Sequence, residues 1–282
     1  MKKSIIYALL FSFCFIQINL AQENNSVTTV KYTAHNKGKF YIFWGGNREN
    51  FSKSDIHFKG TDYDFTLSDV VAEDKPKGWH LDYINPARMT IPQTNFKMGY
   101  FITDNYNIAI GVDHMKYVMS QNQVVNINGT ITENPPFDGI YNNEPIITTE
   151  DFLTYEHTDG LNYVHAEFCR VDDLSSLFKI KNTDKFQINI TEGLGAGLLY
   201  PKTNAKLLGN ERHDDFHISG YGISAKVGLN FTFFKHFFIQ TELKGGYINM
   251  PEIRTTNDPS DSASQHFLFL QRIIAFGGIF EI

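Results

Sequence analysis

The sequence predicts an all-β fold in which eight antiparallel strands close into a transmembrane β-barrel. Side chains alternate between an apolar face and a polar, glycine-rich face in several separate segments, and a period of two is typical of β-strands. Connections between these segments alternate between short and long, which is typical of barrels with short periplasmic turns and long external loops. No stretch beyond the N-terminus approaches the ~18 consecutive apolar residues that a membrane-spanning helix requires.

The segment 216–250 shows this alternation most clearly. Every second residue from Tyr221 to Phe233 is apolar, whereas the residues between them are glycine, serine, lysine, asparagine and threonine. The same alternation resumes after Lys235 and His236, so we expect two antiparallel strands joined by a short turn. In a membrane barrel the apolar face meets lipid and the polar face lines the interior.

Six further strands complete the predicted barrel. We expect them at residues 39–46, 95–102, 107–119, 161–171, 185–200 and 266–282. Long polar segments follow the first, third, fifth and seventh strands, and the two longest, 47–93 and 120–160, are expected to be external loops. Within the first of them, residues 55–70 contain enough Phe, Tyr and Thr for a small hairpin. The even strand count closes the barrel without a free edge.

The N-terminus predicts export. Residues 1–21 form a signal peptide, because Lys2 and Lys3 precede an apolar run that ends at the small residue Ala21. Residues 22–37 are polar, lack periodicity and are expected to be a mobile lead-in on the periplasmic side. The barrel itself is then expected over residues 38–282.

Composition excludes several classes of partner. Removal of the signal peptide leaves 23 basic and 31 acidic residues, a net charge of −8, which argues against nucleic acid as a partner. Cys169 is the one cysteine left, so no intramolecular disulfide is expected. No pattern in the sequence indicates a cofactor.

Four features together resemble the small outer-membrane β-barrel proteins of Gram-negative bacteria, in the style of the Bacteroidota. They are the signal ending at Ala21, the loop asymmetry, the glycine-rich inward faces and the C-terminal strand FGGIFEI. The resemblance covers roughly residues 38–282 as architecture. It implies an outer-membrane location, contact with outer-membrane lipid and lipopolysaccharide, and recognition of residues 266–282 by the barrel-assembly machinery. Members often end in Phe, whereas this chain ends in Ile282.

A soluble β-barrel or β-sandwich is the competing interpretation. It would place the apolar face inside and expose a face that is half glycine, which weakens an exposed strand. Two charges disagree with the membrane interpretation, since Glu192 and Arg272 fall on the predicted lipid face. A β-bulge at Gly277 and Gly278 would turn Arg272 inward.

Six charged side chains are expected to point into the barrel together with His165 and Gln240. They are Lys97, Asp113, Glu167, Lys226, Glu242 and Lys244. Three positive and three negative charges in a narrow interior are expected to pair and to fill the lumen. The alternative interpretation is a path for protons or ions.

Two weaker patterns lie at the external end of the strand that holds Tyr221 and in the loop before it. His217 and Ser219 are two residues apart on the predicted lipid face, which resembles outer-membrane lipid A deacylases that use a lipid-facing His and Ser on one strand. No acid is assigned to that pair. His213, Asp214 and Asp215 are weaker candidates for metal ligands in an external loop, where solvated loop residues are the usual explanation.

The sequence therefore predicts a non-enzymatic outer-membrane barrel that supports envelope integrity or contacts an external ligand or protein through residues 47–93 and 120–160. Two alternatives stay open. One is a lipid-modifying hydrolase that uses His217 and Ser219, and the other is a narrow pore for small solutes.

Overall fold

The computed structural model describes residues 35–76, 78, 93–210 and 215–281. All of them belong to the second of two compact units, Lys31–Ile282, and every regular element among them is a β-strand in one antiparallel sheet. The all-β prediction is confirmed. The predicted signal peptide and residues 22–34 of the predicted lead-in lie outside the described residues.

No helix of the length and hydrophobicity needed to cross a membrane occurs in the described part of the chain.

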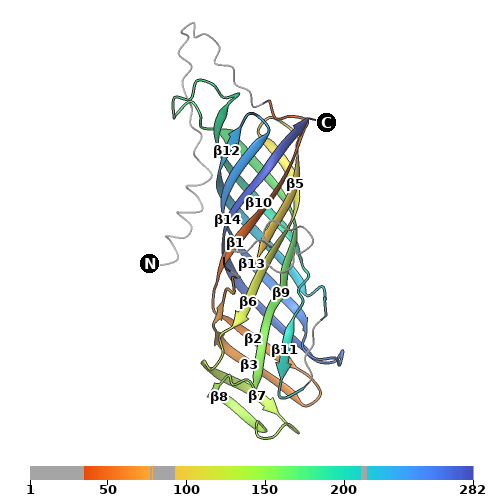
Figure 1. The fold of residues 1–282 in the computed structure, drawn as a ribbon. Coiled ribbons are helices and arrows are strands. Elements are labelled where there is room, and N and C mark those ends of the chain that lie inside the picture. The colour runs from red at the N-terminus through yellow and green to blue at the C-terminus, as the bar shows by residue number, and fades with distance from the viewer. Residues whose placement is uncertain (1–34, 77, 79–92, 211–214, 282) are drawn as a thin grey trace, which may run out of the picture. The chain divides into compact units, whose positions relative to one another are not determined.

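Eight of the strands in the described residues pair in a ring. Their order is β1 (Lys39–Phe51), β5 (Thr94–Phe101), β6 (Tyr106–Met119), β9 (Leu153–Asp173), β10 (Phe186–Leu199), β12 (Gly220–Phe233), β13 (Phe237–Arg254) and β14 (Ser262–Glu281). The ring closes because β1 also pairs with β14 (Figure 1). The closure is uneven, since β14 pairs with β1 from Lys39 to Phe51 whereas β5 pairs with it only from Phe40 to Gly46.

Short connections join strands at one end of the ring. Residues 102–105 link β5 to β6, and residues 234–236 link β12 to β13. Phe234 and Lys235 have φ angles of 52° and 69°, the left-handed conformation that a tight hairpin turn requires. The start of β1 lies at the same end, because Lys39 is opposite Glu281 at the end of β14.

Among the described residues of 47–93 and 120–160 most lie in β-strands, so the prediction of these two segments as loops is wrong. Residues 47–93 contain the end of β1 and the strands β2 (Ser54–Lys59), β3 (Tyr63–Val70) and β4 (Ala72–Glu73). Residues 120–160 contain β7 (Val124–Ile131), β8 (Gly139–Ile147) and the start of β9. A further short strand, β11 (Asn204–Leu207), pairs with β9. The small hairpin predicted at 55–70 is confirmed as β2 and β3.

These added strands build a region that we call the tip, which consists of β2, β3, β4, β7, β8, β11 and the adjoining ends of β6, β9, β13 and β14. The sheet runs from β14 through β2, β3 and β7 to β8. Figure 1 shows β7 and β8 at the end of the barrel away from the last residues of β14. Buried apolar side chains from these strands form one core, in which the rings of Tyr117 and Phe267 stack with centroids 5.0 Å apart.

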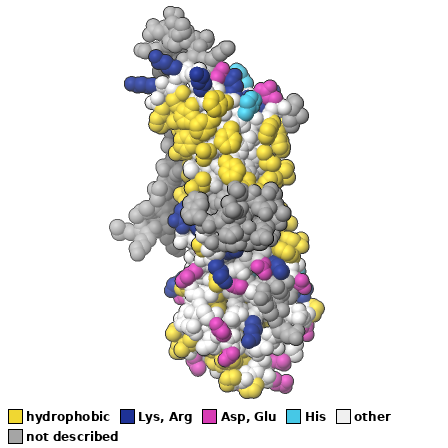
Figure 2. Space-filling model, viewed as in Figure 1, with side chains coloured by type: hydrophobic (Ala, Val, Ile, Leu, Met, Phe, Trp, Pro, Cys, Tyr) yellow, Lys and Arg dark blue, Asp and Glu magenta, His cyan; other side chains and the backbone are white. Residues whose placement is uncertain are grey.

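Outside the tip, the polarity of the barrel is the reverse of that of a soluble protein. Large apolar side chains project outward and are exposed, and we call this surface the apolar band. Its members include Tyr100, Ile108, Ile110, Phe168, Leu194, Leu198, Tyr221, Ile223, Leu229, Ile239, Leu243, Leu270, Ile274 and Phe276. Figure 2 shows hydrophobic side chains gathered over this part of the barrel and charged side chains scattered over the tip.

Strand β6 crosses from one polarity to the other without changing which residues face inward. Its inward positions run from Asn107 and Asp113 to the apolar Met115 and Tyr117, all buried. Its outward residue Ile110 is 60% exposed. The apolar side chains of one strand thus face outward in the barrel and inward in the tip.

The two charges that fall on the predicted lipid face, Glu192 and Arg272, both project outward. Glu192 is exposed and lies opposite Arg170 on β9, which supplies a neighbouring positive charge. Arg272 donates a hydrogen bond to Asn50 Oδ1 at 3.0 Å. The bulge suggested for Gly277 is absent, because β14 keeps a continuous register with β1 and the ring of Phe238 occupies the space beside this glycine.

Candidate functional site

Strand alternation brings the six predicted inward charges together inside the barrel. Lys97 lies on β5, Asp113 on β6, Glu167 on β9, Lys226 on β12, and Glu242 and Lys244 on β13, and all six are buried. We call them the lumen network. The strands that supply them lie on several sides of the ring, so the network extends across the interior.

Glu167 is the centre of the lumen network. Its Oε2 lies 2.7 Å from Lys97 Nζ and 2.9 Å from Lys226 Nζ, and its Oε1 lies 2.9 Å from Lys244 Nζ. Glu242 contacts Lys226 at 2.7 Å and Lys97 at 3.3 Å. Each of these lysines therefore meets two carboxylates, since Lys244 also contacts Asp113 at 2.5 Å.

Polar side chains complete the hydrogen bonds of the lumen network. Asn95 donates to Asp113 Oδ1 at 2.6 Å, and Gln240 donates to Glu242 Oε1 at 2.6 Å. His165 Nε2 lies 3.2 Å from Asp113 Oδ2. Three positive and three negative charges thus balance, as buried charges require. The predicted neighbours His165 and Gln240 both belong to the site.

The interior between the lumen network and the tip is also filled. Gln271 donates to Glu49 Oε1 at 3.0 Å, and Asn47 donates to Asn95 Oδ1 at 2.9 Å. Beyond them lies the aromatic core of the tip. Sequence reasoning missed Glu49 because β1 was expected to end at Gly46, although Glu49 continues the same inward alternation.

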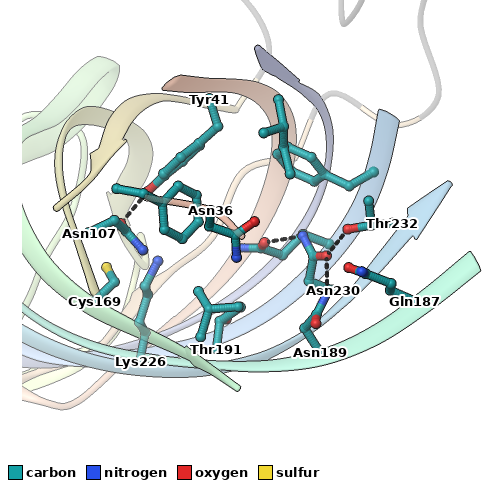
Figure 3. A pocket seen from close by; sticks show the side chains of 15 residues that line it. Asn36, Tyr41, Asn107, Cys169, Gln187, Asn189, Thr191, Lys226, Asn230 and Thr232 are labelled. Atoms are coloured by element: carbon teal, nitrogen blue, oxygen red, sulfur yellow. Dashed lines mark hydrogen bonds between the residues drawn. The ribbon is translucent and has the colours of Figure 1, made fainter. Parts of the chain in front are cut away.

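On the other side of the lumen network lies a small polar cavity of about 40 Å³. Figure 3 shows its amide-rich lining, in which Asn107, Cys169 and Lys226 approach one another. Tyr41 donates to Asn107 Oδ1 at 2.9 Å, and Asn189 donates to Asn230 Oδ1 at 3.2 Å. A cavity of this size holds about three water molecules.

His217 and Ser219 do not form the predicted catalytic pair in this geometry. Ser219 is 2% exposed, so the prediction that it faces lipid is wrong. Strand alternation does not apply to it, because β12 begins only at Gly220. The Ser219 hydroxyl donates to the His217 backbone carbonyl at 3.5 Å, whereas the His217 ring lies 3.6 Å from Glu252 Oε1. A nucleophile and base would need a bond between ring and hydroxyl.

The candidate metal ligands His213 and Asp214 lie outside the described residues, and Asp215 is exposed. Within the described ranges, no group of three or more His, Cys, Asp or Glu side chains is placed to hold a metal ion.

Similarity to known proteins is found only in the fold of solved structures. No protein-family model matches the chain, and no curated protein sequence matches it.

Three outer-membrane β-barrel proteins are among the solved structures that resemble it. Ail, the attachment invasion locus protein of Yersinia pestis, is 11% identical, with a TM-score of 0.32 over 86% of this chain and 99% of that chain. The outer-membrane protein OprG of Pseudomonas aeruginosa is 11% identical, with a TM-score of 0.34 over 88% and 98%. The N-terminal β-barrel domain of Pseudomonas aeruginosa OprF is 9% identical, with a TM-score of 0.30 over 86% and 98%.

Proposed function

We propose that this chain is an eight-stranded outer-membrane β-barrel that acts as a closed anchor and presents the tip outside the cell as a binding surface. The observation that carries the proposal is the change of polarity along single strands. Apolar side chains face outward around the closed ring and inward in the tip. The ring therefore suits lipid and the tip suits water.

The apolar band supports a membrane location for the ring. Monomeric soluble proteins rarely expose contiguous apolar patches larger than a few hundred Å². Here exposed Ile, Leu, Val, Phe and Tyr side chains occur on seven of the ring strands, from β5 to β14. Because the ring has no free edge, its backbone hydrogen bonds are satisfied within lipid. The predicted export signal supports the outer membrane, where lipid and lipopolysaccharide would meet the band.

The orientation follows from the connections. Outer-membrane barrels place short turns in the periplasm and long connections outside. The turns at 102–105 and 234–236 are short, whereas the connections that build the tip are long. The tip therefore faces the exterior, and β14 is the strand that the assembly machinery would recognise.

A closed lumen favours an anchor over a pore. The lumen network crosses the interior with buried, paired charges, and the tip core fills the interior beyond it. A conducting path would need to separate charges that lie 2.5–3.3 Å apart. Removing one partner of a buried ion pair lowers the free energy of unfolding by roughly 3–5 kcal/mol.

The charge of the tip supports a binding role toward a cationic partner. Segment 120–160 contains seven acidic residues and neither Lys nor Arg. The acidic residues are Glu133, Asp138, Glu144, Glu150, Asp151, Glu156 and Asp159. Lys75 pairs with Glu156 and Lys202 with Asp159, so the other five acids carry the excess negative charge of this segment. An excess of one sign raises the association rate of partners of the opposite sign.

Cross-linking on intact cells tests the proposal. The wild-type chain is expected to capture an external partner that is lost when Glu144, Glu150 and Asp151 are changed to Lys. A matched control changes the exposed Lys179, Lys181 and Lys185, at the short-turn end, to Glu. Equal capture by all three chains would contradict external binding through the tip.

Labelling of intact cells tests the orientation. A membrane-impermeant amine reagent should label Lys53, which is exposed beside the tip, and failure to label it would contradict the orientation.

A further inference from the structure

A cleft of about 450 Å³ lies at the tip where four connections converge. The β11–β12 connection contributes Asn210, and the other three are the β2–β3 turn, the β7–β8 connection and the β13–β14 connection. This volume falls within the range of small-molecule sites, roughly 300–1,000 Å³. The lining is mainly polar, and nothing in the ring or the lumen network contributes to it.

Four carboxylates line the cleft, and they come from three of these connections. Asp62 belongs to the β2–β3 turn, Glu133 to the β7–β8 connection, and Asp258 and Asp261 to the β13–β14 connection. None of the four is ion-paired with a Lys or Arg among the described residues, and no Lys or Arg lines the cleft there. Their summed charge gives the cleft a negative potential that attracts cations.

The floor of the cleft is buried and polar. Asp261 is 9% exposed and accepts a hydrogen bond from Thr256 Oγ1 at 2.6 Å. Tyr63 is 5% exposed, and its hydroxyl faces Thr255 and Asp261 without a hydrogen bond of normal geometry to a described residue. A ligand that forms a well-aligned hydrogen bond with this hydroxyl therefore gains affinity from it.

The spread of the carboxylates selects the kind of cation. A divalent ion requires several oxygens that converge on one point. No group of described side chains in the cleft meets that condition. Carboxylates distributed around a cleft of about 450 Å³ instead fit a ligand whose positive charges are separated along a chain.

We propose that this cleft binds a linear polyamine, with ammonium groups on the separated carboxylates and one polar contact to Tyr63. The inference rests on the proposed function, because the tip must face the exterior for the cleft to meet such a ligand. It deepens that function by naming the chemical class of the ligand.

Calorimetric titration of the detergent-solubilised full chain with spermidine tests the site. We expect one spermidine per chain and a loss of about tenfold or more in affinity for the double variant Asp62→Asn with Glu133→Gln. Neither side chain makes a hydrogen bond within the described tip, so the fold is preserved. The matched control, Glu73→Gln, removes an exposed acid of β4 outside the cleft and should leave the affinity within about twofold. Equal losses in both variants would show a general acidic surface and overturn the site.

Tyr63→Phe separates a ligand contact from a structural role. We expect weaker spermidine binding together with a melting temperature that changes little, because the removed hydroxyl makes no hydrogen bond of normal geometry to the described residues. Unchanged spermidine affinity in this variant would remove Tyr63 from the site.

Probe chemistry provides the last comparison. Spermidine should bind at least about tenfold more tightly than butylamine, which has one ammonium group. Tighter binding of Mg²⁺ would overturn the polyamine in favour of a metal, and tighter binding of tri-lysine would overturn it in favour of a basic peptide. Absence of binding by any probe, in a chain whose tip is labelled on intact cells, would overturn this inference and leave the proposed function standing. An unlabelled tip would overturn the proposed function itself.

Discussion

Replacement of Glu167 by Gln removes the charge on which the lumen network depends. Glu167 contacts Lys97, Lys226 and Lys244 at 2.7–2.9 Å. The substitution keeps the shape of the side chain but leaves three buried lysines facing two carboxylates. An uncompensated buried charge costs roughly 3–5 kcal/mol. We therefore expect the free energy of unfolding to fall by about that amount.

Urea unfolding of the protein in lipid vesicles, followed by tryptophan fluorescence, measures this loss. The matched control is Glu281→Gln, which neutralises an exposed carboxylate 3.9 Å from Lys39 at the short-turn end of β14. Solvent-exposed ion pairs contribute up to about 1 kcal/mol, so the control should change stability by no more than that. The double variant Glu167→Gln with Lys97→Met restores charge balance and should be more stable than the sum of the single effects by about 1–3 kcal/mol. A loss for Glu167→Gln no larger than that of the control would refute the reasoning.

Three further predictions follow from particular contacts. Burial among the rings of Tyr117 and Tyr155 lowers the pKa of His157 in the tip to about 3, from an ordinary 6.5. The unfolded chain therefore takes up a proton that the folded chain refuses, and stability falls as pH drops from about 6.5 toward 3. Urea unfolding at pH 7 and pH 4 should show about 3 kcal/mol less acid destabilisation for His157→Phe than for the wild type, and equal losses would contradict the burial argument. Gly277→Ala should destabilise the barrel by about 1–3 kcal/mol, because its Cβ would lie within 2.5 Å of the Ile42 carbonyl and the Phe238 ring. Gly245→Ala is the control, since the nearest atom to its Cβ lies at 3.8 Å, and similar losses in the two variants would argue against close packing as the cause. Tyr117→Phe should cost about 1–2 kcal/mol in thermal unfolding, because Ser54 and Gln265 lose a buried partner, and an unchanged melting temperature would show that this contact adds no stability.

The facing of the barrel strands was predictable because the outer and inner faces of the ring carry opposite polarities on alternate residues. In β12, the apolar Tyr221 and Leu229 project outward while Lys226 lies inside, as the alternation predicted. The lumen network was found by the same reasoning, since an inward charge in a narrow barrel needs a partner on another strand. Its distances and its centre at Glu167 depend on registers between strands, which the alternation does not specify.

The tip was predictable only in part. The β2–β3 hairpin was expected from residues 55–70, whereas β7 and β8 have eight and nine residues beside polar turns, so each one alone resembles a loop with a few apolar residues. The pairing of the tip strands is also distant in the chain, as the bond from Gln265 to Ser54 across 211 positions shows. The cleft at the tip escaped detection because Asp62, Glu133 and Asp261 meet only once this pairing is made.

Single-channel recording in planar lipid bilayers tests the central claim most directly, because an anchor and a pore differ in whether ions cross. The account predicts that the purified wild-type chain inserts without conductance steps above the bare bilayer. Insertion should be verified by showing that the short-turn end and the tip are accessible from opposite sides of the membrane. Stable conductance steps from the inserted wild-type chain would contradict a lumen closed by Lys97, Glu167, Lys226 and Glu242.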